Sequence, residues 1–284
     1  MPAFDVAPYV AAAVDCVLHQ TFADLELVVV DDGSTDATPD VLAAVRDPRV
    51  RVVRRPNGGI VAALNTGLDH VRGELVARMD ADDLMPPDRL ARQVAFLAAH
   101  PRVVACGTDY RQFGTRSGVT RMPRSPAACR ARLLFGTCIA HGTAMIRADV
   151  LRGTGLRYRP EYAYAEDYRF FSDLALSGDL ANLPYVGLEY RMHPRQISTA
   201  KARAQRAVAV RVMRENLAAA GVTGLPDAAL ERMVFADGHG AGAALRHLLG
   251  VAPGILRVGA RAAGAAGVLT AAQLVREQLN AALR

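Results

Sequence analysis

Carboxylates gather at two points of the sequence where apolar segments end. LELVVV at 25–30 runs into two aspartates at 31–32, and ELVARM at 74–79 runs into DADD at 80–83. Carboxylate oxygens are the ligands that hard divalent cations take, and Mg²⁺ or Mn²⁺ is commonly shared between carboxylates and a substrate diphosphate. These acids therefore indicate metal-assisted chemistry on a phosphorylated substrate.

Asp80 and Asp82 have the spacing that suits one shared ligand. Alternate residues of an extended segment point the same way, so both carboxylates can address a single cation. The alternative is a solvated acidic turn that caps the helix opened by PPDRL at 86–90. We favour the cation because the motif follows a strand directly, on the rim where Asp31 and Asp32 are expected.

Strand and helix patterns alternate through the first part of the chain. The expected strands lie at 25–30, 50–55, 74–79 and 103–106, and the expected helices at 8–20, 34–46, 60–71 and from Pro86 onward. Such alternation predicts an α/β fold, with a mainly parallel sheet flanked by helices and right-handed crossovers. Ligands bind beyond the carboxyl ends of the strands in such sheets, so both acid groups are expected on one rim.

The alternation weakens after residue 107. We expect irregular strand and loop at 107–125, helices at 128–136 and 165–177, a strand at 185–191, and helices from about 198 onward. The chain is therefore divided into a main domain at 1–195 and a helical C-terminal extension at 196–284. Because MPAFDV opens the chain without an apolar strand before it, either the sheet lacks its first strand or the true start lies upstream.

The composition is that of a globular protein whose positive charge is unevenly spread. The 284 residues are 51% hydrophobic and 22% charged, with a net charge of +6. From Arg195 onward there are 12 basic and 5 acidic residues, so the excess charge lies in the tail. Its arginines alternate with small apolar residues, which suits either packing on the main domain or peripheral contact with anionic lipid. Without interleaved aromatic residues, the tail does not indicate nucleic-acid binding.

The sequence favours a cytoplasmic protein, with a possible place at the inner face of the cell membrane. The four cysteines form no C-x-x-C pair and no metal-ligand spacing, as expected for reduced thiols. The start has no basic region followed by an apolar core, and the weakly apolar tract 262–275 is too short to span a bilayer.

A dinucleotide-binding dehydrogenase is a rival for a parallel α/β domain. No G-x-G-x-x-G follows any expected strand. The turn after 25–30 offers carboxylates where a pyrophosphate needs backbone N–H groups. The sequence therefore disfavours this rival.

Five blocks, taken together and in order, resemble family 2 glycosyltransferases of the GT-A fold. They are MPAFDVAPYV, QTF-x-D-x-E-L-VVVDDGSTD, NGG-x₅-N-x-G, GEL-x₄-DADD-x₂-PPDRL and AEDYRFF, within residues 1–195. The resemblance implies an inverting transferase that uses Mn²⁺ or Mg²⁺ and moves a sugar from a nucleotide-sugar donor, which we expect to be UDP-linked. The implied acceptor is a hydroxyl of a saccharide or lipid-linked saccharide, in cell-surface polysaccharide or glycolipid assembly.

The resemblance also implies which residues hold the nucleotide: Pro2, Phe4, Asp32, Asn57, Gly58 and Asp80. Asp32 would accept a hydrogen bond from the base, beside a pocket lined by Pro2 and Phe4. Asp80 would approach the ribose. Gly58 would permit close approach of the backbone to the nucleotide.

The remaining implied roles concern the metal, the reaction and the acceptor. Asp82 would bind the metal that bridges the diphosphate, and His193 in YRMHPRQIS would complete its shell or touch the diphosphate. Glu166 and Asp167 resemble the catalytic pair, with Asp167 as the general base for the acceptor hydroxyl. His141 would shape the acceptor pocket. Each also has a plainer interpretation, namely two structural histidines and a charged first turn on an amphipathic helix.

One departure from related enzymes narrows the expected activity. The Q-x-x-R-W motif and the membrane helices of processive polysaccharide synthases are missing, which favours addition of one sugar per encounter. The alternative function is a degenerate transferase that binds a nucleotide sugar without catalysis. The presence of acids for both the metal and the base disfavours that alternative.

Overall fold

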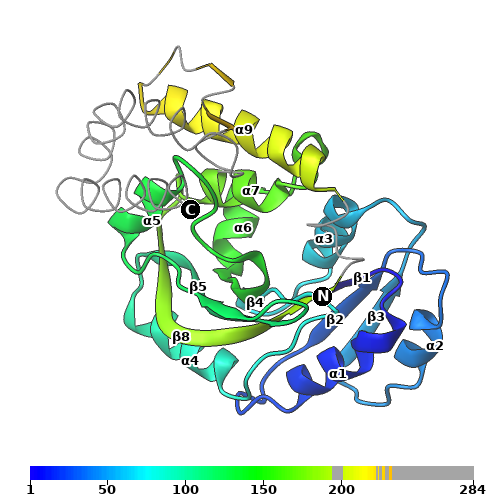
Figure 1. The fold of residues 1–284 in the computed structure, drawn as a ribbon. Coiled ribbons are helices and arrows are strands. Elements are labelled where there is room, and N and C mark those ends of the chain that lie inside the picture. Colours follow the sequence, from blue (N-terminus) through cyan, green and yellow to red (C-terminus); the bar gives the residue numbers. More distant parts are fainter. Residues whose placement is uncertain (194–200, 222, 224–225, 228–229, 232–284) are drawn as a thin grey trace.

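The computed structural model describes residues 1–193, 201–221, 223, 226–227 and 230–231 (Figure 1). Its strands are β1 (Pro2–Ala3), β2 (Leu27–Asp31), β3 (Val50–Arg54), β4 (Leu75–Ala77), β5 (Val103–Gly114), β6 (Gly118–Thr120), β7 (Met145–Arg147) and β8 (Asp179–Met192). Its helices are α1 (Ala7–Leu18), α2 (Thr38–Ala43), α3 (Ile60–Asp69), α4 (Arg89–Ala99), α5 (Pro126–Arg132), α6 (Ala148–Thr154), α7 (Glu166–Leu174) and α9 (Ala202–Ala219), with 3₁₀ turns η1 (His141–Thr143) and η2 (Pro160–Tyr162).

The first sheet is parallel and has the order β1-β2-β3. Its strands are joined through α1 and α2, as the alternating pattern predicted. β1 is only two residues long, with Pro2 beside Val30 and Ala3 beside Asp31. The expectation of a missing first strand is therefore corrected, because these two residues form a short strand in its place. The chain leaves it at Asp5, whose φ is 50°.

The second sheet is mixed, and it is more regular than the sequence indicated. β7 runs antiparallel to both β4 and β5, while β8 pairs in parallel with β5 along most of its length. β5 continues through Gly114 and returns antiparallel as β6, in the stretch expected to be irregular. The polar residues after 108 hide this strand from a hydrophobicity pattern, whereas pairing with β8 provides its backbone partners.

The helices cover both faces of the sheets. In Figure 1, α1 and α4 lie on one side, and α3, α6 and α7 lie on the other. The buried apolar residues accordingly form two clusters. One includes Val10 and Val14 of α1, and the other includes Phe170 and Phe171 of α7.

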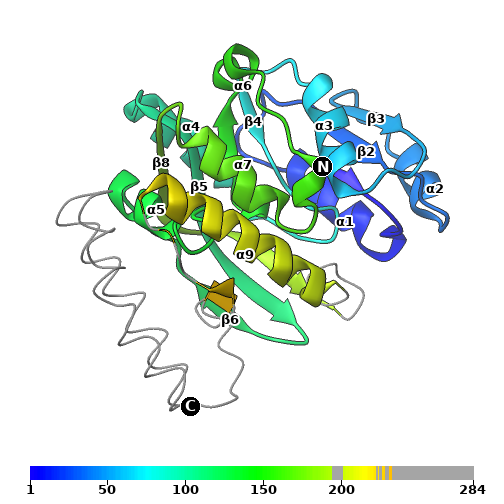
Figure 2. The same ribbon diagram turned by 90° about the horizontal axis from the view of Figure 1, so that it is seen from above.

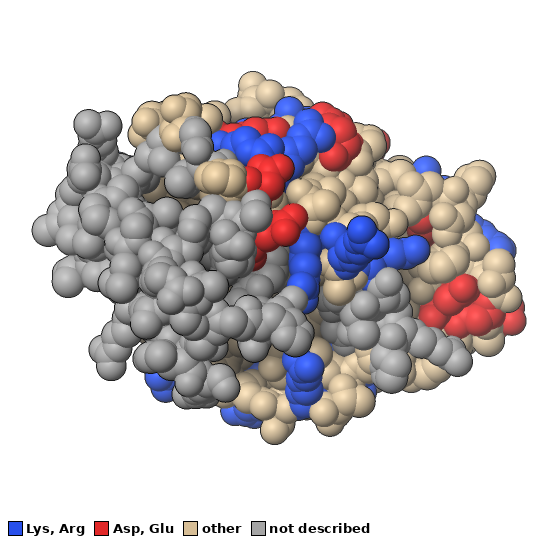
Figure 3. All heavy atoms as spheres, turned by 45° about the horizontal axis from the view of Figure 1, so that its top comes forward, with Lys and Arg blue, Asp and Glu red and all other residues tan. Residues whose placement is uncertain are grey.

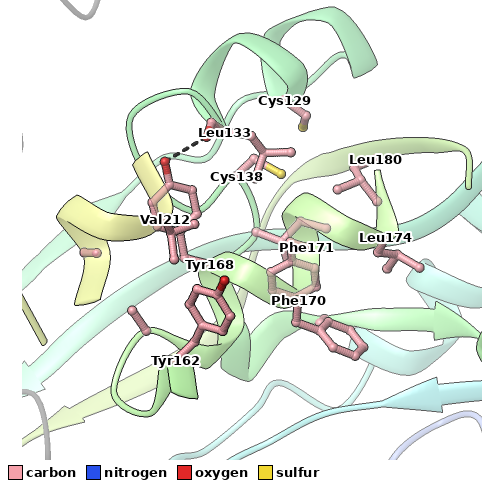
Figure 4. Packing of buried hydrophobic residues seen from close by; sticks show 14 of the residues in the cluster. Cys129, Leu133, Cys138, Tyr162, Tyr168, Phe170, Phe171, Leu174, Leu180 and Val212 are labelled. Carbon is pink, nitrogen blue, oxygen red and sulfur yellow. Dashed lines mark hydrogen bonds between the residues drawn. The ribbon is translucent and has the colours of Figure 1, made fainter. Parts of the chain in front are cut away.

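Helix α7 shows the amphipathic character expected of it. Phe170, Phe171 and Leu174 are buried. The buried Tyr168 donates its hydroxyl to the Leu133 carbonyl oxygen over 2.8 Å (Figure 4). This packing fixes the helix whose first two residues are Glu166 and Asp167.

Helix α9 belongs to the sequence region predicted as an extension, and it packs alongside α7 (Figure 2). Its buried side chains join the same cluster as those of α7; they are Ala209, Val210, Val212, Met213 and Leu217. α9 therefore shares the core of the main domain. Arg195, Arg257, Arg261 and the tract 262–275 lie outside the described residues, and so does most of the basic tail. Within the described part, no helix is both long and apolar enough to span a bilayer.

Met213 tests the contribution of α9 to the core. Its side chain is fully buried, so Met213→Ala should lower the free energy of unfolding by about 3 kcal/mol through lost contacts and an unfilled cavity. Leu176, which is 85% exposed, provides the control. Leu176→Ala should change the free energy of unfolding by less than about 0.5 kcal/mol. Urea denaturation measures both. Equal stability of the two variants would contradict the packing of α9.

Candidate active site

Three aspartates follow β4 and form the densest acidic group among the described residues. One carboxylate oxygen from each of Asp80, Asp82 and Asp83 lies within 4.8 Å of the others. Asp83 is buried, and its Oδ1 accepts a hydrogen bond from the Arg191 backbone N–H over 2.7 Å. Its buried Oδ2 has no hydrogen-bond partner. The group thus presents clustered hard oxygen atoms, one of them unsatisfied.

The electrostatics of this group fit a divalent cation. Burial, followed by repulsion from Asp80 and Asp82, raises the pKa of Asp83 to about 9. Burial is also the main cause of the raised pKa of Asp80, and Asp82 adds to it. A bound cation would relieve this repulsion, and the oxygen ligands are of the type that Mg²⁺ and Mn²⁺ prefer. Asp83 was not among the predicted site residues, although its place in DADD could have identified it.

Arg78 lies at the centre of the charged groups and was missed in the sequence. Its side chain is buried and forms an ion pair with Asp80. Its charge also lowers the pKa values of Asp83, Glu166 and Asp167. The available signal was its position, because Arg78 and Asp80 are alternate residues of the segment 74–80 that the sequence predicts as extended, and such residues point the same way.

Glu166 and Asp167 begin α7, where Glu166 is buried and Asp167 is half-buried. Glu166 is buried, and its Oε2 has no hydrogen-bond partner. Burial and the neighbouring Asp167 raise the pKa of Glu166 to about 7. Burial also raises the pKa of Asp167, and the charge of Asp80 adds to that effect while Arg78 opposes it. The structure thus brings Asp167 within electrostatic reach of the acids after β4.

His141 lies in η1 and packs into the wall of this region. Its Nε2 lies 2.9 Å from the Tyr158 hydroxyl oxygen, and Tyr158 stacks on Phe170 with ring centroids 4.1 Å apart. Burial and the charge of Arg78 lower the pKa of His141 well below its ordinary value, so the ring is neutral. Tyr158 was missed, because nothing in its local sequence indicates this partner. The acceptor role of His141 stays a prediction.

His193 contacts one of the acids. Its Nε2 lies 3.0 Å from Oδ2 of Asp82, and its ring centroid is 5.2 Å from that of Tyr9 in α1. Arg191 donates from Nε to the Asp82 carbonyl oxygen, and its guanidinium lies over the Tyr9 ring. These contacts hold the end of β8 against the DADD segment. They put His193 beside the proposed cation site through Asp82.

Asp32 follows β2 and makes its side-chain contacts with the loop after β3. Its buried carboxylate pairs with Arg55 and accepts from the backbone N–H of Gly59 over 2.7 Å and of Gly58 over 3.1 Å. The turn at Gly33 has a φ of 76°, and a side chain there would meet the Asn57 backbone nitrogen at 2.7 Å. The structure thus places Asp32 against the backbone of Gly58, and Gly33 close to the backbone of Asn57. The nucleotide-binding role of Asn57 and Gly58 stays a prediction.

The two residues predicted to line the base pocket, Pro2 and Phe4, differ in their exposure to solvent. Pro2 is half-buried in β1, and Phe4 exposes 46% of its surface. No contact between Asp32 and the acids after β4 is recorded among the described residues. The base-binding roles of Pro2, Phe4 and Asp32 therefore stay predictions.

Comparison with known proteins gives the site a context. A model of the family described as Glycosyl transferase family 2 matches residues 1–154. An uncharacterized glycosyltransferase from Haemophilus influenzae is 31% identical over 230 residues, which are 76% of this chain and 71% of that protein. The succinoglycan biosynthesis protein ExoO of Rhizobium meliloti is 32% identical over 211 residues, which cover 69% of this chain and 60% of that protein.

Solved structures share the fold. S. aureus TarS 1–349 in complex with UDP-GlcNAc superposes with a TM-score of 0.66 at 18% identity, covering 98% of this chain and 89% of that one. The mannosyltransferase PcManGT from Pyrobaculum calidifontis, in complex with GDP-Man and Mn²⁺, has a TM-score of 0.60 at 22% identity, covering 99% of this chain and 84% of that one. These likenesses confirm the predicted GT-A type α/β fold.

From the raised pKa of Glu166 we expect the stability of the protein to depend on pH. The folded protein holds the Glu166 proton more tightly than the ordinary value of 4.5 allows, so ionisation costs stability as pH rises from 4.5 to about 7. Glu166→Gln cannot ionise. Its melting temperature should exceed that of the native protein at pH 8, and this difference should shrink towards pH 4.5.

Glu161→Gln is the control for this measurement, because Glu161 is exposed in η2. Thermal denaturation across the pH range should show no comparable trend for it. A pH-independent difference between Glu166→Gln and the native protein would contradict the raised pKa.

Proposed function

The chain belongs to glycosyl transferase family 2, and from this premise we propose that it transfers a sugar from a UDP-linked donor to a saccharide hydroxyl with inversion. The observation that supports this most directly is the arrangement around Arg78. Its charge reaches acids suited to a cation, Asp80 and Asp83, and also the acid pair at the start of α7. A sugar-diphosphate transferase needs both kinds of acid near the bond that breaks.

The proposed reaction is a single displacement at the anomeric carbon. Asp167 accepts the proton of the acceptor hydroxyl as its oxygen forms the new bond to that carbon. The bond to the diphosphate oxygen breaks on the opposite side, and the nucleoside diphosphate leaves with the bonding electron pair. The raised pKa of Asp167 suits this role, because a base whose pKa is closer to neutral removes a proton more readily.

Asp80, Asp82 and Asp83 would hold the Mg²⁺ or Mn²⁺ ion, with His193 beside Asp82. The bound cation would neutralise the charge that grows on the leaving diphosphate. Arg191, which is held on the Asp82 carbonyl, keeps the DADD segment in place. PcManGT was solved with Mn²⁺ together with its donor GDP-Man, which supports a metal in this chain.

The donor and acceptor classes are also part of this proposal. TarS was solved with UDP-GlcNAc, and ExoO is named for succinoglycan biosynthesis. These names support a UDP-sugar donor and a saccharide or lipid-linked acceptor, in the assembly of cell-surface polysaccharide or glycolipid. A lipid-linked acceptor would place the protein at the inner face of the cell membrane.

Asp167→Asn separates catalysis from binding. The amide cannot accept the proton, so kcat should fall by a factor of about 100 or more while the affinity for UDP is retained. Asp149→Asn on the exposed part of α6 is the matched control and should keep full turnover. Turnover is measured as UDP release with a saccharide acceptor, and affinity by calorimetry. A native protein that binds UDP-sugar without turnover would favour the alternative, a non-catalytic binder.

The cation site is tested with the metal alone. Mn²⁺ should raise the melting temperature of the native protein, and Asp82→Asn should weaken Mn²⁺ binding about tenfold or more, because one ligand charge is lost. The exposed Asp69→Asn on α3 is the control and should bind Mn²⁺ as the native protein does. The bound fraction is measured by the electron paramagnetic resonance of free Mn²⁺.

The donor class is tested by adding nucleotides to the same thermal measurement. A UDP-sugar should stabilise the protein further only when Mn²⁺ is present. Stabilisation by a UDP-sugar without any metal would contradict the proposed role of the aspartates. Stabilisation by NADH instead would favour a dinucleotide-binding protein.

A further inference from the structure

The backbone immediately before Glu166 has a conformation that needs external support. Tyr164 has a φ of 77°, in the left-handed region that side-chain-bearing residues rarely adopt. The Ala165 N–H donates to the Tyr162 carbonyl oxygen over 3.0 Å, which closes the turn. A bulky residue persists in this region only where its surroundings hold it there.

Helix α9 provides that support from the C-terminal part of the chain. The Gln205 side chain is half-buried, and its Nε2 donates to the Tyr164 carbonyl oxygen over 3.0 Å. Gln205 lies in the first turn of α9, 41 residues after Tyr164. The hydrogen bond thus connects α9 to the residue whose conformation aims the start of α7.

Further contacts join α9 to residues that precede the acid pair and to residues that follow it. Before the pair, the Tyr162 hydroxyl donates to Glu215 over 2.9 Å. After it, Arg169 pairs with Glu215 at 3.2 Å, and Asn216 donates to the Ser172 hydroxyl over 2.9 Å. In Figure 3, acidic and basic side chains lie side by side on the face that carries α9, as these pairs require. α9 is therefore held in a fixed position relative to α7.

We propose that α9 is part of the catalytic unit, and that Gln205 is a positioning residue that aims Glu166 and Asp167 through the Tyr164 backbone. Neither residue 205 nor residue 164 falls in the stretch matched by the family model, which ends at residue 154. The inference rests on the proposed transferase function for its catalytic consequence. Its geometric part, the support of the 164–167 turn by α9, does not depend on the reaction.

A change in the conformation of this turn would alter the pKa values of Glu166 and Asp167. The backbone N–H groups of Glu166 and, to a smaller extent, of Tyr164 lower the pKa of Glu166 in the present geometry. Arg78 lowers both pKa values, Asp167 raises that of Glu166, and Asp80 raises that of Asp167. The backbone N–H groups of Tyr168 and Asp167 lower the pKa of Asp167, and Tyr158 is itself affected by both acids. If the turn relaxes, the N–H groups of Tyr164 and Glu166 move away from the Glu166 carboxylate and the apparent pKa of the pair rises.

The test compares two variants of the full chain that receive the same new side chain. Gln205→Met keeps the length of the side chain and the helix propensity but removes the N–H group that donates to Tyr164. Arg203→Met alters an exposed position two residues earlier on α9. For Gln205→Met, kcat should fall about tenfold, because the general base is less well placed. The KM for the nucleotide sugar should change by less than about twofold, because none of the proposed nucleotide-binding residues lies in α9. Its acid limb of kcat against pH should move up by about half a unit.

Arg203→Met should leave kcat and the pH profile as they are in the native protein. The inference is overturned if Gln205→Met keeps native kcat, or if kcat falls without any movement of the acid limb. The second outcome would indicate general destabilisation rather than positioning.

Amide hydrogen exchange separates this inference from the proposed function. In the absence of the nucleotide sugar and the saccharide acceptor, the peptide that spans 163–172 should exchange its amide hydrogens faster in Gln205→Met than in Arg203→Met. The reason is that the turn at 164–167 is no longer held by α9. Equal exchange overturns the inference even if the native protein is an active transferase. If the native protein transfers no sugar, the proposed function fails, whereas faster exchange would still support the geometric part.

Discussion

The constraint on which this structure depends is the charge balance around Arg78. Asp80 repels Asp83 and Asp167, Asp167 repels Glu166, and burial strengthens this repulsion because little water is present to screen it. Arg78 is the positive charge that reaches all of them. Glycine at residue 142 of η1 helps this turn to lie close to Arg78, because a Cβ there would lie 2.8 Å from the Leu188 side chain and 3.5 Å from the Arg78 guanidinium. The raised pKa values show that this balance is incomplete, which leaves the site suited to a cation.

The fold satisfies this constraint by bringing together segments that are far apart in the sequence. The DADD segment follows β4, Arg191 near the end of β8 donates its backbone N–H to Asp83, and α7 begins with the acid pair. The helix that holds α7 comes from still later in the chain. Two core clusters, one around α1 and one around α7 and α9, keep these elements in place.

Much of this organisation was predictable, because local patterns report what local interactions decide. The apolar run 25–30 and the helix pattern at 60–71 became β2 and α3 with small shifts at their ends. The mixed second sheet was not predictable in this way. β5 beyond residue 108 reads DYRQFG, which is too polar to indicate a buried strand, and its backbone pairs with β8. Two residues of β1 were likewise too few to recognise without their partner in β2.

The sequence by itself determined the α/β class, the family resemblance and the identity of the acids, because these depend on residue type and short spacing. Only the tertiary structure decided that Arg191 binds Asp83, that His141 lies beside Tyr158, and that Gln205 supports Tyr164. The physical reason is the same in each case. Burial and long-range contacts set the charge state and the aim of a side chain, and neither is encoded in its neighbours along the chain.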